Sequence, residues 1–201
     1  MLLCSVNAMP PLSALLFAPV PEKQLKPALS IEVASYPADE AADEAKLLQR
    51  IQQAPTFFRG AYGADGQLRG FICGTLTSAK KLTDESMSNH EPGGNKLCIH
   101  SVVVEAAVRR RGIALWMLQS YMRHVHEAAP MVSRIMLICK EPLVGLYERA
   151  GFGVVGPSDV VHGADPWILM AASRVPHDKR DNGWEPGYTD DGGDDDALEL
   201  D

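Results

Sequence analysis

The sequence predicts a single α/β (α+β) domain, and three features support this fold class. Residues 97–104 are apolar and rich in β-branched side chains, which is typical of a buried strand. They are followed by a glycine-containing turn and an amphipathic helix at residues 112–127. Residues 57–77 have the pattern of a β-hairpin. A chain of 201 residues suits one domain with a substantial core, so we expect strands and helices to share one core.

Hydrophobic periodicity, interrupted by proline and glycine, predicts the other elements. In chain order we expect a strand at 12–19, helices at 22–33 and 39–53, hairpin strands at 57–62 and 68–77, the strand at 97–104, the helix at 112–127, a strand at 135–139, a helix at 141–150 and strands at 152–155 and 167–171. Residues 79–95 are polar and predict a loop. Regular alternation in the strand at 97–104 would place positions 98, 100, 102 and 104 on one face.

Acidic charge is concentrated at the C-terminus. The net charge is −7, but residues 176–201 alone carry ten acidic and two basic side chains, which leaves a body of about +1. We therefore expect an N-terminal arm at 1–11, the folded domain at 12–175 and an acidic, disordered tail at 176–201. The body has no broad basic surface and no apolar run that could span a bilayer, so neither nucleic acid nor a membrane is an expected partner.

The four cysteines predict a reducing compartment. Cys4, Cys73, Cys98 and Cys139 show no C-x-x-C pair and no zinc-ligand spacing, so we expect no metal site and read them as small reduced residues, mostly in the core. The apolar N-terminal stretch has no Lys or Arg and is a poor secretory or transit signal. These observations favour a cytoplasmic location.

The turn after the strand at 97–104 has the composition of a phosphate site. Arg109, Arg110 and Arg111 precede Gly112, and Ala114 follows in the first helical turn. The first N–H groups of a helix have no partner inside the helix, and the helix dipole is positive there. A pyrophosphate group can satisfy these N–H groups, and glycine lets the backbone approach it closely. An ordinary solvated basic turn has the same composition, but its place between strand and helix favours the phosphate site.

The spacing Arg109-x-x-Gly112-x-Ala114 resembles the acetyl-CoA-binding loop of the GCN5-related N-acetyltransferases, the GNAT family. Further motifs resemble one branch of that family, the serotonin (arylalkylamine) N-acetyltransferases, and the Tyr36-Pro37-x-Asp39-Glu40-Ala41 stretch resembles its non-vertebrate members. The other matching motifs are Leu82-Thr83-x-Glu85-Ser86-Met87, then His90, Pro92 and Gly94, then Cys98-Ile99-His100, and Leu146-Tyr147-Glu148-Arg149 with Gly151-Phe152.

This resemblance implies a GNAT fold, with a mixed and mostly antiparallel central sheet flanked by helices. It also implies acetyl-CoA as co-substrate, with its pantetheine arm on one strand and its pyrophosphate on the turn that follows. The strand residues implied are Val102, Val103 and Val104, whose backbone would pair with the pantetheine amides. The residues implied at the pyrophosphate are Arg109, Arg110, Arg111, Gly112, Ile113, Ala114 and Leu115.

Acetyl transfer to an amine requires that a proton leave the amine and that another reach the departing thiolate. His100 is the candidate for the first role, because an imidazole is available in its neutral form near pH 7. Tyr147 is the candidate acid, because a phenol stays protonated at that pH and can donate to a thiolate. Each could instead be an ordinary buried side chain. Where vertebrate relatives have two histidines, this chain has Cys98 and then His100, which leaves the base role to His100 or to ordered water.

An arylalkylamine pocket needs apolar and aromatic walls. The available side chains are Tyr36, Pro37, Phe57, Met87 and Trp167, any of which could equally be plain core. The resemblance implies that a small-molecule amine such as serotonin or tryptamine is acetylated by direct transfer in a ternary complex, a step of melatonin biosynthesis. We expect a monomer or a weak dimer. The alternatives are a polyamine or diamine acetyltransferase, a protein N-terminal acetyltransferase, or an acetyl-CoA-binding module without turnover.

Overall fold

A computed structural model describes residues 11–83, 87, 89–160, 163 and 166–174, and the backbone of 184–186. One eight-stranded sheet organises the described chain, with strand order β1-β2-β3-β4-β5-β7-β6 and β8 paired to β7. The strands are β1 (Leu16–Pro19), β2 (Phe58–Tyr62), β3 (Leu68–Thr77), β4 (Lys96–Val104), β5 (Arg134–Cys139), β6 (Gly153–Pro157), β7 (Ile168–Arg174) and β8 (Trp184–Pro186). The α-helices are α1 (Leu25–Val33), α2 (Glu44–Gln53), α4 (Ile113–Ala128) and α5 (Val144–Arg149).

The sheet is mixed, as expected. Every neighbouring pair of strands is antiparallel except β4 and β5, which are parallel. The order of strands and helices from β1 to β7 also agrees with the predicted order. Two predicted helices begin with 3₁₀ turns, Glu22–Gln24 before α1 and Glu141–Leu143 before α5.

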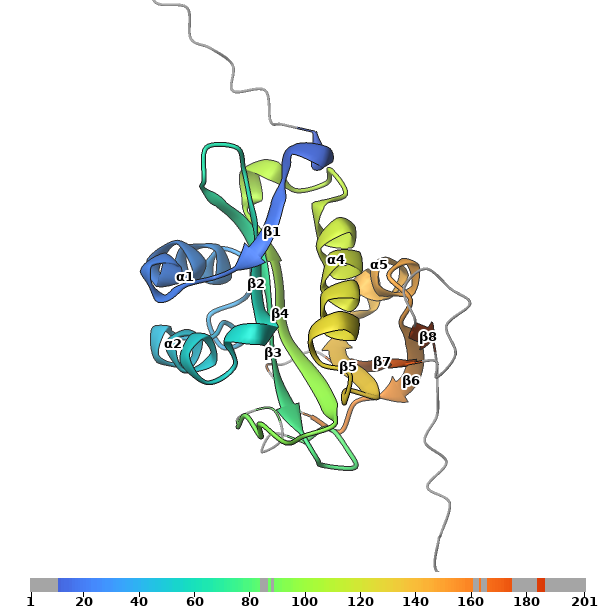
Figure 1. The fold of residues 1–201 in the computed structure, drawn as a ribbon. Helices are drawn as coiled ribbons and strands as arrows, with labels where there is room; N and C mark the ends of the chain where they lie inside the picture. Colours follow the sequence, from blue (N-terminus) through green and yellow to red (C-terminus); the bar gives the residue numbers. More distant parts are fainter. Residues whose placement is uncertain are drawn as a thin grey trace, which may run out of the picture.

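Helices cover both faces of the sheet (Figure 1). Helices α1 and α2 lie on one face, where Leu47 and Ile51 of α2 pack with Phe58 and Phe71 of the sheet. Helix α4 lies on the opposite face and buries Met117, Tyr121 and other residues of its apolar stripe. Each face therefore has its own apolar core, and β2, β3 and β4 contribute to both.

Helix α2 starts five residues later than its periodicity predicted. Residues before Asp43 form turns, in which the N–H groups of Glu40 and Ala41 donate to the carbonyl of Pro37. The side chain of Asp43 accepts a hydrogen bond from the N–H of Lys46 at 2.8 Å and thereby caps the helix. The predicted start at residue 39 is wrong because this cap and the preceding turns define the first helical residue as Glu44.

A strand occurs inside the segment expected to be an acidic tail. Strand β8 pairs antiparallel with the end of β7, with Trp184 opposite Arg174. The expectation of an unstructured segment does not hold for residues 184–186, because the outer edge of β7 offers them backbone partners. The rest of the predicted tail and residues 1–10 lie outside the described residues.

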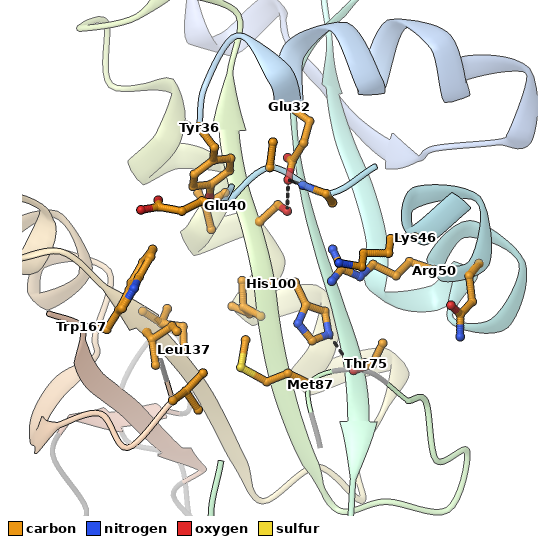
Figure 2. Close-up of a pocket in the computed structure, with 18 of the residues that line it drawn as sticks. Glu32, Tyr36, Glu40, Lys46, Arg50, Thr75, Met87, His100, Leu137 and Trp167 are labelled. Carbon is orange, nitrogen blue, oxygen red and sulfur yellow. Dashed lines mark hydrogen bonds between the residues drawn. The ribbon is translucent and has the colours of Figure 1, made fainter. Parts of the chain in front are cut away.

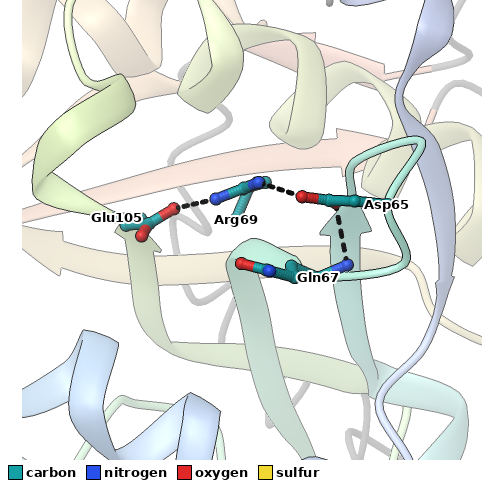
Figure 3. Close-up of polar contacts among 4 residues, drawn as sticks. All are labelled: Asp65, Gln67, Arg69 and Glu105. Atoms are coloured by element: carbon teal, nitrogen blue, oxygen red, sulfur yellow. Dashed lines mark hydrogen bonds and ion pairs between the residues drawn. The ribbon is translucent and has the colours of Figure 1, made fainter. Parts of the chain in front are cut away.

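A charged cluster joins the β2–β3 hairpin to the end of β4 (Figure 3). The guanidinium of Arg69 donates to Asp65 at 2.5 Å and to Glu105 at 2.9 Å, and the N–H of Gln67 donates to the other oxygen of Asp65. The N–H of Glu105 also donates to the carbonyl of Arg69 at 2.8 Å. These contacts anchor the point where the chain leaves β4 for the arginine-rich turn.

Candidate active site

A cavity of about 330 Å³ lies where β4 and β5 separate. The two strands pair only from Lys96 to Cys98 of β4, although both continue beyond these residues. Residues 99–102 of β4 and 137–138 of β5 line the cavity. Because the parallel ladder stops there, the backbone of each strand can accept an extended ligand in place of a neighbouring strand.

His100 reaches this cavity because of a β-bulge. The β3–β4 register passes from Cys73 opposite Ser101 to Gly74 opposite Ile99, so His100 has no partner residue in β3. Ser101 and the imidazole consequently both point toward α1 and α2, whereas Val102 and Val104 pack toward α4. The expectation that positions 98, 100, 102 and 104 share one face is therefore wrong, since the bulge shifts the alternation.

The imidazole of His100 is held neutral. Its Nε2 lies 2.7 Å from Oγ1 of Thr75, while its buried Nδ1 has no hydrogen-bond partner among the described residues (Figure 2). Burial, and then the positive charge of Arg50, lower the pKa of His100 well below 6.5. A neutral ring with an unpartnered nitrogen can accept a hydrogen bond from a ligand, but it holds a proton only weakly.

Tyr147 lines the same cavity from α5. Its side chain is buried, and its ring packs edge-on against Phe152 with centroids 6.0 Å apart. Burial, with a smaller effect of Cys139, raises the pKa of Tyr147 far above 10. The phenol therefore remains a proton donor across the physiological range.

Three of the five predicted acceptor residues line the cavity, namely Tyr36, Met87 and Trp167. The other two do not. Pro37 is exposed in the turn after α1, and Phe57 is buried in the core on the α4 side, where its carbonyl accepts a hydrogen bond from Tyr121. An aromatic residue at a strand start does not reveal which face it will occupy, which explains the wrong assignment of Phe57.

Helices α1 and α2 contribute cavity residues that the sequence did not identify. Glu32 comes from the end of α1, and Lys46 and Arg50 come from one face of α2 (Figure 2). Thr75 of β3 and His90 of the following loop complete this polar side. The only sequence signal was a polar residue, Glu32, in the apolar half of a short helix, and that signal is weak.

An ion pair lies beside Trp167 in the wall of the cavity. Nζ of Lys140 lies 2.5 Å from Oε1 of Glu40 and 4.9 Å from the centre of the Trp167 ring. Glu40 belongs to the turn before α2, while Lys140 and Trp167 belong to the β5–β7 half of the sheet. The contacts thus connect the two halves of the domain beside Trp167.

The turn that precedes α4 has the geometry expected of an anion site. Gly112, the N-cap of α4, has a φ of 80°, and Arg110 has a φ of 63°. No side chain caps the helix, and its first turn contains no acidic residue. The N–H groups at the start of α4 are therefore available to a phosphate oxygen, as are the exposed side chains of Arg110 and Arg111.

Arg109 is engaged elsewhere. Its Nε donates to the carbonyl of Val104 at 2.9 Å, and its Nη2 donates to Ser35 Oγ at 2.9 Å and to the carbonyl of Ala34 at 3.2 Å. This side chain joins the end of β4 to the end of α1. These three acceptors use its guanidinium, and a contact of Arg109 with the pyrophosphate stays a prediction.

The other residues that were predicted to bind acetyl-CoA differ in whether their side chains or only their backbone groups can reach a ligand. Val102 borders the cavity, as does Tyr36. Val103 and Val104 are buried on opposite faces of β4, and Ile113 lies in the core under α4, so they can contribute only backbone groups. The half-buried side chains that follow in α4 are those of Ala114 and Leu115.

Neither buried thiol near the site is a ready nucleophile. Burial raises the pKa of Cys98 to about 12 and that of Cys139 to about 11. Cys98 packs with Leu82, Met136 and Ala171 away from the cavity. At neutral pH both are thiols, so Cys98 does not replace the missing second histidine as a base.

A divergent pair of parallel strands beside an uncapped helix N-terminus suits a ligand that is extended at one end and phosphorylated at the other. A coenzyme A thioester has this chemistry. The family model described as "Acetyltransferase (GNAT) family" matches residues 25–152. The chain therefore belongs to the GNAT family, as its motifs suggested.

Similar proteins agree with this assignment. The chain is 37% identical over 109 residues to serotonin N-acetyltransferase of Mesocricetus auratus, and 35% identical over 113 residues to that of Homo sapiens. These matches cover 54% and 56% of this chain and 52% and 54% of those proteins, so the chain spans about half the length of the curated relatives it matches.

Solved structures share the fold at low sequence identity. The GphF GNAT-like decarboxylase in complex with isobutyryl-CoA has a TM-score of 0.70 at 14% identity, covering 79% of this chain and 98% of that one. Arabidopsis thaliana Naa50 in complex with the bisubstrate analogue CoA-Ac-MVNAL has a TM-score of 0.59 at 17% identity, covering 80% and 99%. Both neighbours were determined with a CoA ligand. None of the described helices is long and apolar enough to cross a bilayer.

Proposed function

We propose that the protein is an acetyl-CoA-dependent N-acetyltransferase that acetylates the primary amine of arylalkylamines such as serotonin and tryptamine. The observation that carries this proposal is that His100 and Tyr147 line one cavity at the point where β4 and β5 separate. The curated relatives, serotonin N-acetyltransferases by name, support the substrate class. Tyr36, Trp167 and Met87 supply an aromatic and apolar wall for an aryl group.

In this proposal the cofactor is held by the backbone of β4 and the start of α4. The N–H groups that follow Gly112, with Arg110 and Arg111, hold the pyrophosphate, and the unpaired edge of β4 around Val102 holds the extended arm. Acetyl-CoA supplies an activated acetyl thioester.

Two residues of the cavity accept and donate the protons of the reaction. Nδ1 of neutral His100 accepts a hydrogen bond from the neutral amine and takes the proton that the amine nitrogen loses as it bonds to the acetyl carbon. Tyr147 donates a proton to the departing sulfur, because its phenol is fully protonated. The high thiol pKa values of Cys98 and Cys139 favour direct transfer over an acetyl-cysteine route. Unchanged turnover in Cys98→Ala would support direct transfer, whereas loss of turnover in the folded variant would contradict it.

The experiment is CoA release from acetyl-CoA with a panel of acceptors. The panel contains serotonin, tryptamine, phenylethylamine, spermidine, putrescine and a short peptide. We expect turnover confined to the aromatic amines, and acetylation of serotonin would connect the protein to melatonin biosynthesis. Turnover only with polyamines or the peptide would overturn the substrate class and retain the activity. Acetyl-CoA binding without turnover of any amine would instead indicate a binding module.

A further inference from the structure

Glu32 is the most deeply buried acidic side chain of the cavity, with 1% of its surface exposed. We propose that Oε2 of Glu32 binds the ammonium group of the acceptor and thereby selects cationic amines. This inference rests on the proposed N-acetyltransferase function but applies to any primary amine. Glu32 lies at the end of α1, outside the motifs that identify the family branch.

The two oxygens of Glu32 have different surroundings. Oε1 accepts hydrogen bonds from the N–H of Ala42 at 3.1 Å and from Oγ of Ser101 at 3.0 Å (Figure 2). Oε2 is buried and has no hydrogen-bond partner among the described residues. One oxygen therefore fixes the carboxylate in position, and the other is left for a ligand.

An unpartnered buried carboxylate oxygen is unfavourable unless something replaces the lost water. Burial raises the pKa of Glu32, and Arg50 of α2 is a cation that opposes this rise. The guanidinium of Arg50 and the carboxylate of Glu32 do not approach within the 4.0 Å of an ion pair. An ammonium group carries three donors on a compact charge, whereas the guanidinium is larger and planar. A ligand ammonium would satisfy Oε2.

The position of Glu32 relative to His100 fits this role. Ser101, which holds Oε1, is the residue after His100 in the bulge of β4. The same local distortion thus turns both the imidazole and the partner of Glu32 toward α1 and the cavity. The imidazole binds protons weakly, so an amine that enters as an ammonium needs an anionic partner near it. Glu32 provides that partner.

The test compares an amine with its neutral isostere. Inhibition or binding constants are measured for tryptamine and for tryptophol, in which a hydroxyl replaces the amino group, on the protein saturated with a non-transferable acetyl-CoA analogue. We expect the wild-type protein to bind the amine about ten- to hundredfold more tightly than the alcohol. Equal binding of the two ligands by the wild-type protein would overturn the proposal without any variant.

Glu32→Gln is the matched variant, because its amide oxygen can still accept from Ala42 and Ser101 while the charge is lost. We expect it to remove most of the preference for the amine and to leave the binding of tryptophol and of the acetyl-CoA analogue within about twofold. A general loosening of α1 would weaken both ligands equally and leave their ratio unchanged, which would overturn the proposal.

Glu40→Gln is the control for the other carboxylate of the cavity, whose Oε1 already contacts Lys140. Loss of the amine preference in Glu40→Gln, and not in Glu32→Gln, would assign the ammonium to Glu40 and overturn the proposal. If the wild-type protein acetylates only a non-aromatic amine, the proposed substrate class fails, and the same comparison is made with that amine and its alcohol.

Discussion

The cofactor turn and the acceptor cavity differ in how their residues are distributed along the chain. The turn uses consecutive residues between β4 and α4, and its geometry depends on backbone angles at Arg110 and Gly112. The cavity combines residues from α1, α2, β3, β4, β5 and α5 with residues of the connections between α1 and α2, between β3 and β4, and between β6 and β7. A site made from consecutive residues leaves a readable motif, whereas a site made from many elements depends on how those elements pack.

The largest expected effect tests the cavity. Tyr147→Phe should lower kcat about a hundredfold, because it removes the proton donor and keeps the buried ring against Phe152. Acetyl-CoA affinity should change little, since Tyr147 lines the cavity and no residue of the turn before α4 does. Steady-state kinetics and calorimetry on the same preparation measure the two quantities. A kcat within threefold of wild type would exclude Tyr147 as the acid.

The second effect tests the turn. Gly112→Val should weaken acetyl-CoA binding at least about tenfold, because a β-branched residue at a φ of 80° is strained by about 1–3 kcal/mol and would displace the N–H groups of α4. Gly66→Val is the matched control, since Gly66 of the hairpin turn also has a positive φ, 74°, and an added Cβ there would meet no atom within 4 Å. Calorimetry should show normal acetyl-CoA affinity for a folded Gly66 variant. Normal affinity in the Gly112 variant would contradict the assigned site.

A third prediction concerns pH and the burial of His100. Because its folded-state pKa is lowered well below 6.5, the unfolded chain takes up a proton that the folded chain does not. Stability should therefore fall as pH decreases from 7 to 5, and His100 should account for about 2 kcal/mol of this loss at most. Urea denaturation of wild type and His100→Gln at pH 7, 6 and 5 measures the difference. Identical pH dependence in the two proteins would show that the imidazole is not buried as described.

The smallest effect separates two neighbouring arginines. Arg109→Ala should reduce the free energy of unfolding by about 1 kcal/mol, because an exposed side chain loses hydrogen bonds to Val104 and the end of α1. Arg110→Ala should leave stability nearly unchanged and weaken acetyl-CoA binding only a few-fold, since main-chain N–H groups provide much of the site. Thermal denaturation and calorimetry distinguish the two. A reversed pattern would place Arg109, and not Arg110, at the phosphate.

The sequence predictions were accurate where a feature depends on neighbouring residues and wrong where it depends on contacts between distant segments. The hairpin, the strand at β4 and the helix after Gly112 were predicted within one or two residues, because alternation, turn residues and helical spacing are local properties. The predicted start of α2 was wrong because the helix cap at Asp43 and the turns that begin at Pro37 make the helix start later than its hydrophobic periodicity indicates. The strand β8 was not expected, because it is only three residues long and lies in a segment rich in Asp, Gly and Pro.

The sequence by itself determined the family, the order of strands and helices, and the glycine turn before α4, because each is encoded in neighbouring residues. Only the tertiary structure decided which side chains face the cavity. The bulge at His100 changes which side of β4 each residue faces, and Phe57 packs in the core. Three hydrogen bonds direct the side chain of Arg109 toward the ends of β4 and α1. Packing likewise places Glu32 of α1 beside Ser101 of β4. Such contacts depend on the free energy of the whole packed arrangement, which no single segment of sequence specifies.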